Sequence, residues 1–256
     1  MNDYIEMVSY DRPMDAYVCS DLHGNLNLAL QIAEIAQQGN TIFFLGDACD
    51  RGENGWEIIK LFLHEPNIIY LLGNHEDMLT KAMRGYFLHQ DDEYRYSRAY
   101  ETWTWNGCFD TEDSILTDDF EVAKKYYQRL DHLPTRAKYI NDEGKVIYMS
   151  HSGYEFFAYE SDVIIDKKDL IWDRNHYYNP AWIGQENEFD VHGHTPIPYL
   201  IEEINPGEWN GNSALWYCHT HKIDLDMLTI KTNKICLLNL NTFEETILEG
   251  YDDGKL

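Results

Sequence analysis

A buried strand that ends in a polar turn is predicted by residues 41–52, TIFFLGDACDRG. The strand residues are apolar or β-branched, and the run stops at Gly46-Asp47. Further strands and helices are expected on the same grounds at residues 16–19 and 68–72, and at 26–36, 53–64 and from about 76. This alternation indicates parallel strands with helical crossovers, and sites in such folds lie where strands end and helices begin.

The rest of the chain changes in character. Residues 77–133 are expected to be mainly helical, and their Tyr- and Trp-rich stretch 94–105 is either a lid or packed core. Strands with few helices between them are then expected at 146–149, 189–191, 235–238 and 242–248. We therefore predict an α/β fold (α+β by some schemes), a central β-sandwich of two mixed sheets flanked by helices. With no repeat or linker, residues 1–256 are expected to form one domain.

Composition limits the function classes. The chain has 256 residues and a net charge of -25, which argues against an extended nucleic-acid surface, because neutralising phosphates requires Lys and Arg. It has no run of about 18 apolar residues and no signal-like start, so no membrane span or secretion is expected. Its five cysteines are scattered, without CxxC spacing. They predict free thiols and a cytoplasmic protein.

Polar motifs recur along the chain, and most of them follow apolar runs directly. They are Asp21-Leu22-His23-Gly24-Asn25, Gly46-Asp47-Ala48-Cys49-Asp50-Arg51-Gly52, Gly73-Asn74-His75-Glu76, Ser150-His151-Ser152-Gly153, Asp173-Arg174 and Gly193-His194-Thr195. Carboxylates, imidazoles and an amide are hard or borderline ligands, which suit Mn²⁺, Fe or Zn²⁺ better than a thiolate zinc site does. Their ordered occurrence predicts a metal centre.

These motifs resemble those of the phosphoprotein phosphatase family of calcineurin-like metallophosphoesterases. The likeness is strongest to the bacterial and bacteriophage branch, typified by the lambda phage Ser/Thr phosphatase, and extends over residues 17–223. It includes the segment Trp103-Thr104-Trp105-Asn106-Gly107-Cys108. The sequence departs from the family at Ser20, where Gly is usual, and at Ile223-Asp224-Leu225-Asp226, where the family has Ile-Asp-Thr-Gly.

The resemblance implies two divalent metal ions, Mn²⁺ first and Fe or Zn²⁺ as alternatives. It implies the metal ligands Asp21, His23, Asp47, Asn74, His151 and His194. Asp47 would bridge the two ions, and a water held between them would lose a proton and attack phosphorus.

The same resemblance implies the remaining catalytic roles. His75 would protonate the leaving oxygen as general acid, and Asp50 would orient it. Arg51 and Arg174 would grip the phosphoryl oxygens, because the guanidinium fork binds two oxygens and keeps its charge. For Arg174 a surface salt bridge is the alternative. Glu76 can equally be a carboxylate that stabilises the start of a helix, because negative charge is favoured there.

Three functions remain open from the sequence. The first is a Ser/Thr-type protein phosphatase, or a general phosphomonoesterase acting on small phosphoesters. The second is a dinucleoside polyphosphate or nucleotide phosphohydrolase or phosphodiesterase, because the same metal site can attack anhydrides and diesters. The third is an inactive scaffold that binds a partner. The presence of every motif residue disfavours this third function. The sequence predicts a phosphorylated protein or small phosphoester as partner, no extended nucleic acid and no membrane.

Overall fold

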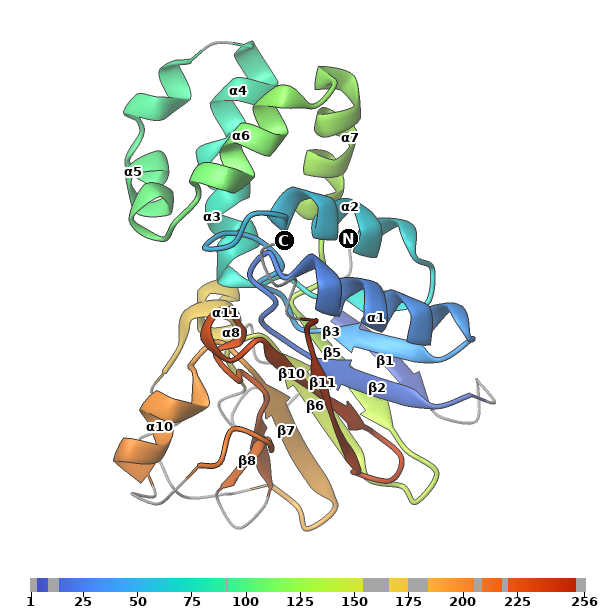
Figure 1. Ribbon diagram of the computed structural model, residues 1–256. Helices are drawn as coiled ribbons and strands as arrows, with labels where there is room; N and C mark the ends of the chain where they lie inside the picture. The colour runs from blue at the N-terminus through green and yellow to red at the C-terminus, as the bar shows by residue number, and fades with distance from the viewer. Residues whose placement is uncertain are drawn as a thin grey trace.

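Two mixed β-sheets lie face to face, and most helices gather at one end of them (Figure 1). The computed structural model describes residues 4–8, 14–90, 92–153, 166–174, 184–204, 209–217 and 221–251. The predicted fold class, two mixed sheets flanked by helices, is confirmed. In the described part, no helix is both long enough and apolar enough to cross a membrane.

The first sheet has five strands. Its order is β11 (Glu245–Glu249), β10 (Lys234–Asn239), β2 (Ala16–Cys19), β3 (Thr41–Phe44) and β4 (Ile68–Tyr70). The strands β2, β3 and β4 are parallel, and β10 is antiparallel to both β2 and β11. The carboxyl ends of β2, β3 and β4 therefore meet at one edge.

The second sheet has six strands. Its order is β1 (Tyr4–Val8), β5 (Arg136–Ile140), β6 (Val146–Ser150), β7 (Glu188–His192), β9 (Lys222–Asp224) and β8 (Leu215–Tyr217). The neighbours β6, β7 and β9 are parallel, whereas β5 and β8 are antiparallel to β6 and β9. The strands β1, β5, β8 and β9 were not anticipated from the sequence.

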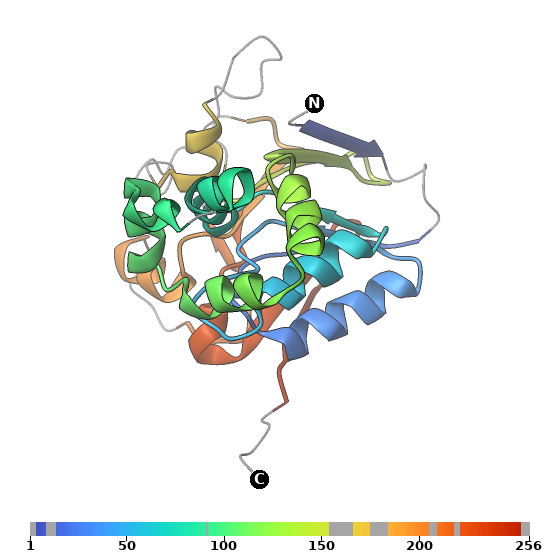
Figure 2. The ribbon, with the colours of Figure 1, turned by 90° about the horizontal axis from the view of Figure 1, so that it is seen from above.

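The core alternates along each strand. Val18 and Phe43 point between the sheets, where they pack with Tyr139 and Met149 of the second sheet. Their neighbours face outward, against α1 (Leu26–Gln37) and α2 (Gly55–His64), which lie side by side (Figure 2). Successive side chains of a strand point to opposite faces of the sheet. Because both faces are buried here, the strand sequences are apolar throughout.

Residues 74–130 form a helical cap above the sheets (Figure 1). Its helices are α3 (Asn74–Ala82), α4 (Arg84–His89), the 3-10 turn Glu93–Tyr96, α5 (Arg98–Trp105), α6 (Phe109–Thr117) and α7 (Phe120–Leu130). Tyr94 and Trp103 are buried in this cap, whereas Tyr96 and Trp105 are exposed. The aromatic stretch is therefore partly packed core and partly surface. The shorter helices elsewhere are α8 (Lys167–Trp172), α10 (Ile197–Ile204) and α11 (Thr229–Thr232).

Two element boundaries correct the sequence expectations. The helix expected from about Glu76 begins at Asn74, so Asn74 and His75 lie in its first turn. The last strand begins at Glu245 rather than Thr242. There the Asn239 side chain accepts hydrogen bonds from the backbone of Asn241 and Thr242, and these bonds form a turn.

Candidate metal centre

The six predicted metal ligands converge at the ends of strands from both sheets. Asp21 and His23 follow β2, Asp47 follows β3, and Asn74 follows β4 at the start of α3. His151 and His194 follow β6 and β7 of the second sheet, and all six side chains are buried. The sequence predicts the metals at the carboxyl ends of the first-sheet strands, and the structure adds the ends of β6 and β7 from the second sheet.

Asp47 stands between two groups of donors. Its Oδ2 lies 3.8 Å from His23 Nε2, while its Oδ1 lies 3.3 Å from His151 Nε2. Asp21 Oδ1 lies 3.9 Å from His23 Nε2 on the first side. Ligand atoms of Asp47 with His23 and His75, and of Asp47 with Asp21 and His151, are close enough to share a cation. One carboxylate therefore faces two candidate cation positions.

Asn74 completes the second group. Its Oδ1 lies 2.8 Å from His151 Nε2 and 2.9 Å from His194 Nδ1. His151 Nδ1 donates to the Leu45 carbonyl oxygen at 2.9 Å, which leaves Nε2 directed into the centre. Such an outer hydrogen bond fixes the ring orientation and tautomer of a metal-binding histidine.

Three residues of the predicted site each have one buried atom without a hydrogen-bond partner among the described residues, namely Asp21 Oδ1, Asp50 Oδ1 and His75 Nε2. Buried polar atoms without a partner are rare, because leaving one costs about 1–3 kcal/mol. A divalent cation would satisfy the Asp21 oxygen, and a substrate oxygen would satisfy the His75 nitrogen. The oxygen and nitrogen donor set thus fits a divalent metal ion.

The backbone at the centre is unusual. Of the ten non-glycine residues with positive φ among the described residues, six belong to the predicted site: Asp21, His23, Asp47, Asp50, Arg51 and His194. This left-handed conformation costs of order 1–3 kcal/mol for each residue and clusters at functional sites. Gly193 is required for a different reason, since a Cβ there would collide with the Asp21 carboxylate.

His75 belongs to a buried hydrogen-bonded group. Its Nδ1 donates to Asp50 Oδ2 at 2.7 Å, and Trp103 Nε1 donates to the same oxygen at 2.8 Å. Burial by itself lowers the pKa of His75, but Asp47 and the Asp50 hydrogen bond outweigh burial, so the pKa is raised above its usual value. A protonated His75 with an open Nε2 has the form of a general acid.

The two predicted phosphate-binding arginines lie on opposite sides of the centre. Arg51 Nη1 donates to His23 Nε2 at 3.2 Å, and Arg174 Nε donates to His194 Nε2 at 3.3 Å. Both residues are exposed. Among the described residues no carboxylate forms an ion pair with Arg174, and the surface salt-bridge alternative stays open.

The pKa shifts of Asp47 and His23 indicate the protonation state of each buried group. Burial raises the pKa of Asp47, but the neighbouring His151 and His75 outweigh it and hold the pKa well below its usual range. Burial and, after it, the nearby His75 lower the pKa of His23 to about 3. Asp47 is therefore a carboxylate and His23 a neutral imidazole, which are the forms that bind metals.

Glu76 has a larger part than a helix-start carboxylate. Its two oxygens accept hydrogen bonds from the backbone N–H groups of Asp47, Ala48 and Gly73, from the Tyr70 hydroxyl and from the Cys49 thiol. It thereby ties the loop after β3 to the loop after β4. The sequence pattern does not predict these hydrogen bonds, because they join loops that follow different strands.

Trp103 is a candidate site residue that sequence reasoning missed. Its segment is part of the family resemblance, but a tryptophan in an aromatic stretch is usually core, and only the indole contact with Asp50 reveals its place.

His192 and Cys49 are not directed at the metal centre. His192 Nε2 lies 2.7 Å from the Tyr217 hydroxyl. Cys49 is buried, and burial raises the pKa of its thiol well above the usual range.

A family model described as calcineurin-like phosphoesterase matches residues 14–226. The chain belongs to this family. Its members are metal-dependent phosphoester hydrolases, in agreement with the buried carboxylates and imidazoles described above. The matched range contains every predicted ligand together with His75, Asp50 and both arginines.

Curated relatives match shorter segments. The serine/threonine-protein phosphatase rdgC of Drosophila melanogaster is 35% identical over 85 residues, which are 30% of this chain and 13% of that protein. The human serine/threonine-protein phosphatase with EF-hands 1 is 36% identical over 77 residues, 27% of this chain and 12% of that protein. The chain thus spans a small part of the length of the curated relatives that it matches.

Solved structures share the fold over nearly the whole chain. One is described as a putative diadenosine tetraphosphatase, with 13% identity, a TM-score of 0.58, and coverage of 98% of this chain and 100% of that one. A protein serine/threonine phosphatase from Saccharomyces cerevisiae has 14% identity and a TM-score of 0.53, and the likeness covers 100% of this chain and 86% of that one. At these identities the likeness shows the fold alone.

Proposed function

We propose that this protein is a two-metal phosphomonoesterase of the Ser/Thr protein phosphatase type. The observation that carries the proposal is the position of Asp47, whose two oxygens face separate histidines, His23 and His151. Asp21 and His23 are assigned to one cation, Asn74, His151 and His194 to the other, and Asp47 to both. Mn²⁺ is the proposed ion, with Fe or Zn²⁺ as alternatives. When bound, the ions would neutralise phosphate charge and lower the pKa of a water.

The protein's own residues would carry out the other tasks. Arg51 and Arg174 would hold phosphoryl oxygens from opposite sides, in a chain whose net charge of -25 otherwise repels an anion. His75 would donate its Nε2 proton to the leaving oxygen, while Asp50 and Trp103 fix the ring. The curated phosphatase relatives support a phosphorylated Ser or Thr side chain as the leaving group.

A second function, hydrolysis of a dinucleoside polyphosphate, is favoured by one feature. Trp105 and Phe109 are exposed, and they flank Gly107, whose carbonyl oxygen accepts a hydrogen bond from the Arg51 backbone at 2.9 Å. Flat aromatic rings beside a phosphate-binding arginine are suited to stacking a nucleobase.

One panel of substrates tests both functions. Hydrolysis of p-nitrophenyl phosphate, bis-p-nitrophenyl phosphate, a phosphoserine peptide, a phosphotyrosine peptide and diadenosine tetraphosphate would be measured with Mn²⁺ and with EDTA. Metal-dependent activity led by the monoester and the phosphoserine peptide supports the first proposal. Activity led by the diester or the dinucleotide supports the second, and no activity with any metal contradicts both.

The cytoplasmic location and the single domain stay predictions.

A further inference from the structure

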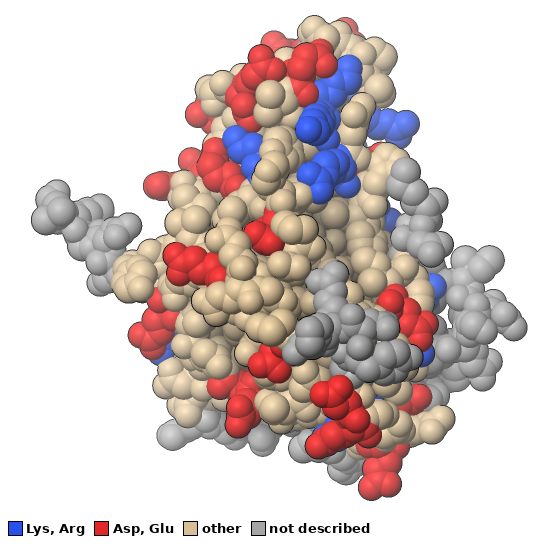
Figure 3. All heavy atoms as spheres, turned by 90° about the vertical axis from the view of Figure 1, so that its right-hand side faces the viewer, with Lys and Arg blue, Asp and Glu red and all other residues tan. Residues whose placement is uncertain are grey.

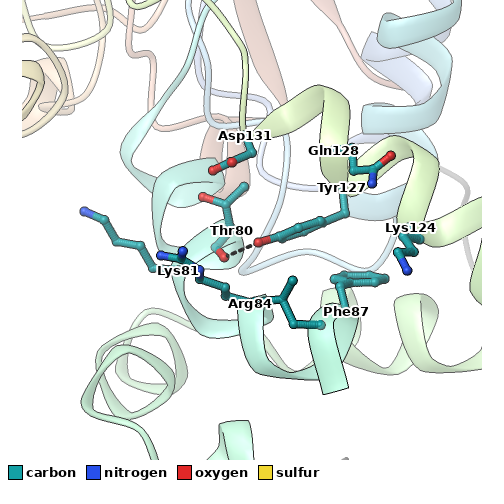
Figure 4. A pocket seen from close by; sticks show the side chains of 9 residues that line it. Thr80, Lys81, Arg84, Phe87, Lys124, Tyr127, Gln128 and Asp131 are labelled. Carbon is teal, nitrogen blue, oxygen red and sulfur yellow. Dashed lines mark hydrogen bonds between the residues drawn. The ribbon is translucent and has the colours of Figure 1, made fainter. Parts of the chain in front are cut away.

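A cavity of about 320 Å³ lies within the helical cap, among side chains from α3, α4 and α7 (Figure 4). None of the residues proposed for the metal centre lines it. Its walls are joined by the Tyr127 hydroxyl of α7, which donates to the Thr80 carbonyl oxygen of α3 at 3.1 Å. The Phe87 ring stacks on Tyr127 with centroids 4.4 Å apart. The cavity is thus held open by packed helices rather than by a loop.

The charge of this cavity is opposite to that of the protein. Lys81, Arg84 and Lys124 line it together with one acid, Asp131, although the whole chain has 20 basic and 45 acidic residues. Lys and Arg side chains gather over the helical part of one face, while Asp and Glu predominate below (Figure 3). A basic site on an acidic protein attracts an anionic ligand locally, against the field of the whole molecule.

Two of the three cations are available to a ligand. Lys81 pairs with Asp77 Oδ2 at 2.7 Å. Among the described residues no carboxylate forms an ion pair with Arg84 or Lys124, and the Lys124 ammonium lies over the Phe120 ring, 5.4 Å from its centroid. The Leu88 side chain at the edge of the cavity is 62% exposed. The cavity therefore offers two unpaired cations beside an exposed apolar side chain.

We propose that this cavity docks an acidic segment of the protein substrate, with Glu or Asp side chains at Arg84 and Lys124 and an apolar side chain against Leu88. This inference rests on the proposed protein phosphatase activity. The helix α3 begins at Asn74 in the metal centre and ends beside the cavity, and Asn74 and Lys81 are roughly 10 Å apart along its axis. A docked substrate would raise the effective concentration of its phosphorylated residue at the metal centre.

The binding test uses a fluorescein-labelled, unphosphorylated peptide of glutamates around a central leucine. Its fluorescence anisotropy is measured with the full chain in EDTA, so that glutamates cannot bind a metal. R84E/K124E is compared with wild type and with the control K138E/K145E, which reverses one charge in β5 and one directly before β6. We expect roughly tenfold weaker binding for R84E/K124E, because attraction becomes repulsion at two sites, and little change for the control. Rising salt should weaken wild-type binding.

Equal affinity of wild type and R84E/K124E, or equal binding of a peptide with lysine in place of glutamate, would overturn the proposal. Circular dichroism checks the fold of each variant, and R84A/K124A replaces the charge reversal if that variant does not fold. Weaker peptide binding by the folded alanine variant supports docking, and unchanged binding rejects it.

Kinetics separates this proposal from the proposed function. The kcat/KM values for a phosphoserine peptide with an acidic tail, for the same peptide without the tail, and for p-nitrophenyl phosphate are compared. Docking predicts that R84E/K124E loses the advantage of the tail specifically. An equal loss on all three substrates contradicts docking. Failure to hydrolyse any phosphopeptide while the anisotropy difference persists contradicts the proposed substrate class but leaves the acidic-segment site in place.

Discussion

His75 Nδ1 lies 2.7 Å from Asp50 Oδ2, and both side chains are fully buried. This contact fixes the imidazole so that Nε2, which has no hydrogen-bond partner among the described residues and lies 3.8 Å from Asp47 Oδ2, faces the metal centre. The carboxylate also favours the protonated imidazole, which is the form a general acid needs.

We expect His75→Asn to lower kcat by about 10²–10⁴, the usual contribution of a general acid. The loss should be smaller with p-nitrophenyl phosphate than with a phosphoserine peptide, because p-nitrophenolate leaves without protonation. Mn²⁺ content, measured by elemental analysis, should stay close to wild type. A loss of the same size for every leaving group would show that His75 has another role.

Trp103 and Trp105 form a matched pair, since the first is fully buried and donates to Asp50 while the second is 84% exposed. We expect Trp103→Phe to lower kcat on the phosphoserine peptide roughly tenfold, equivalent to about 1.4 kcal/mol, because Asp50 loses a donor and holds His75 less firmly. Trp105→Phe is the control and should leave kcat on p-nitrophenyl phosphate unchanged. If Trp103→Phe changes only thermal stability, or lowers kcat equally for good and poor leaving groups, the indole does not position the acid.

Asp47→Asn tests the shared carboxylate. Because its two oxygens face different histidines, we expect the variant to weaken both cation sites together. Mn²⁺ titration by calorimetry should show both sites weakened, and a variant of only one group, His194→Asn, should weaken one site more than the other. Two filled sites with wild-type activity in Asp47→Asn would remove the bridging assignment.

Asp118 provides a pH-dependent prediction away from the metal centre. Burial by itself raises the pKa of Asp118, but hydrogen bonds from Trp56 Nε1 and Lys60 Nζ, both at 2.9 Å, outweigh burial and lower the pKa. A lowered pKa means that the carboxylate stabilises the fold above its unfolded pKa of about 3.9, and that this stability is lost as pH falls through the folded pKa.

Accordingly, Asp118→Asn should lower the free energy of unfolding by about 1–2 kcal/mol at pH 7. The difference from wild type should shrink as the pH falls below about 4. Urea denaturation of both proteins at a series of pH values measures it. A difference that is constant or grows toward low pH would contradict the assignment.

The sequence determined the strand ends and therefore most of the centre. Apolar runs that stop at Gly46-Asp47 and Gly73-Asn74 predict parallel strands with polar residues at one edge, because such strands are buried on both faces and their helices begin there. The six predicted ligands are what the motif resemblance implies, and the structure brings all six side chains together. These features are local, so a single sequence is enough to predict them.

Contacts between distant segments were decided by the tertiary structure alone. The packing of the two sheets and the cap decides which side chains the second sheet brings to the centre. It also decides the hydrogen bond from Trp103 to Asp50 and the five donors around Glu76. Hydrophobic periodicity does not encode this packing. The same holds for the cavity beside Arg84 and Lys124, whose residues come from three helices. Side-chain hydrogen bonds and charge clusters across elements depend on ångström-scale placement, and that placement is fixed only when the whole core packs.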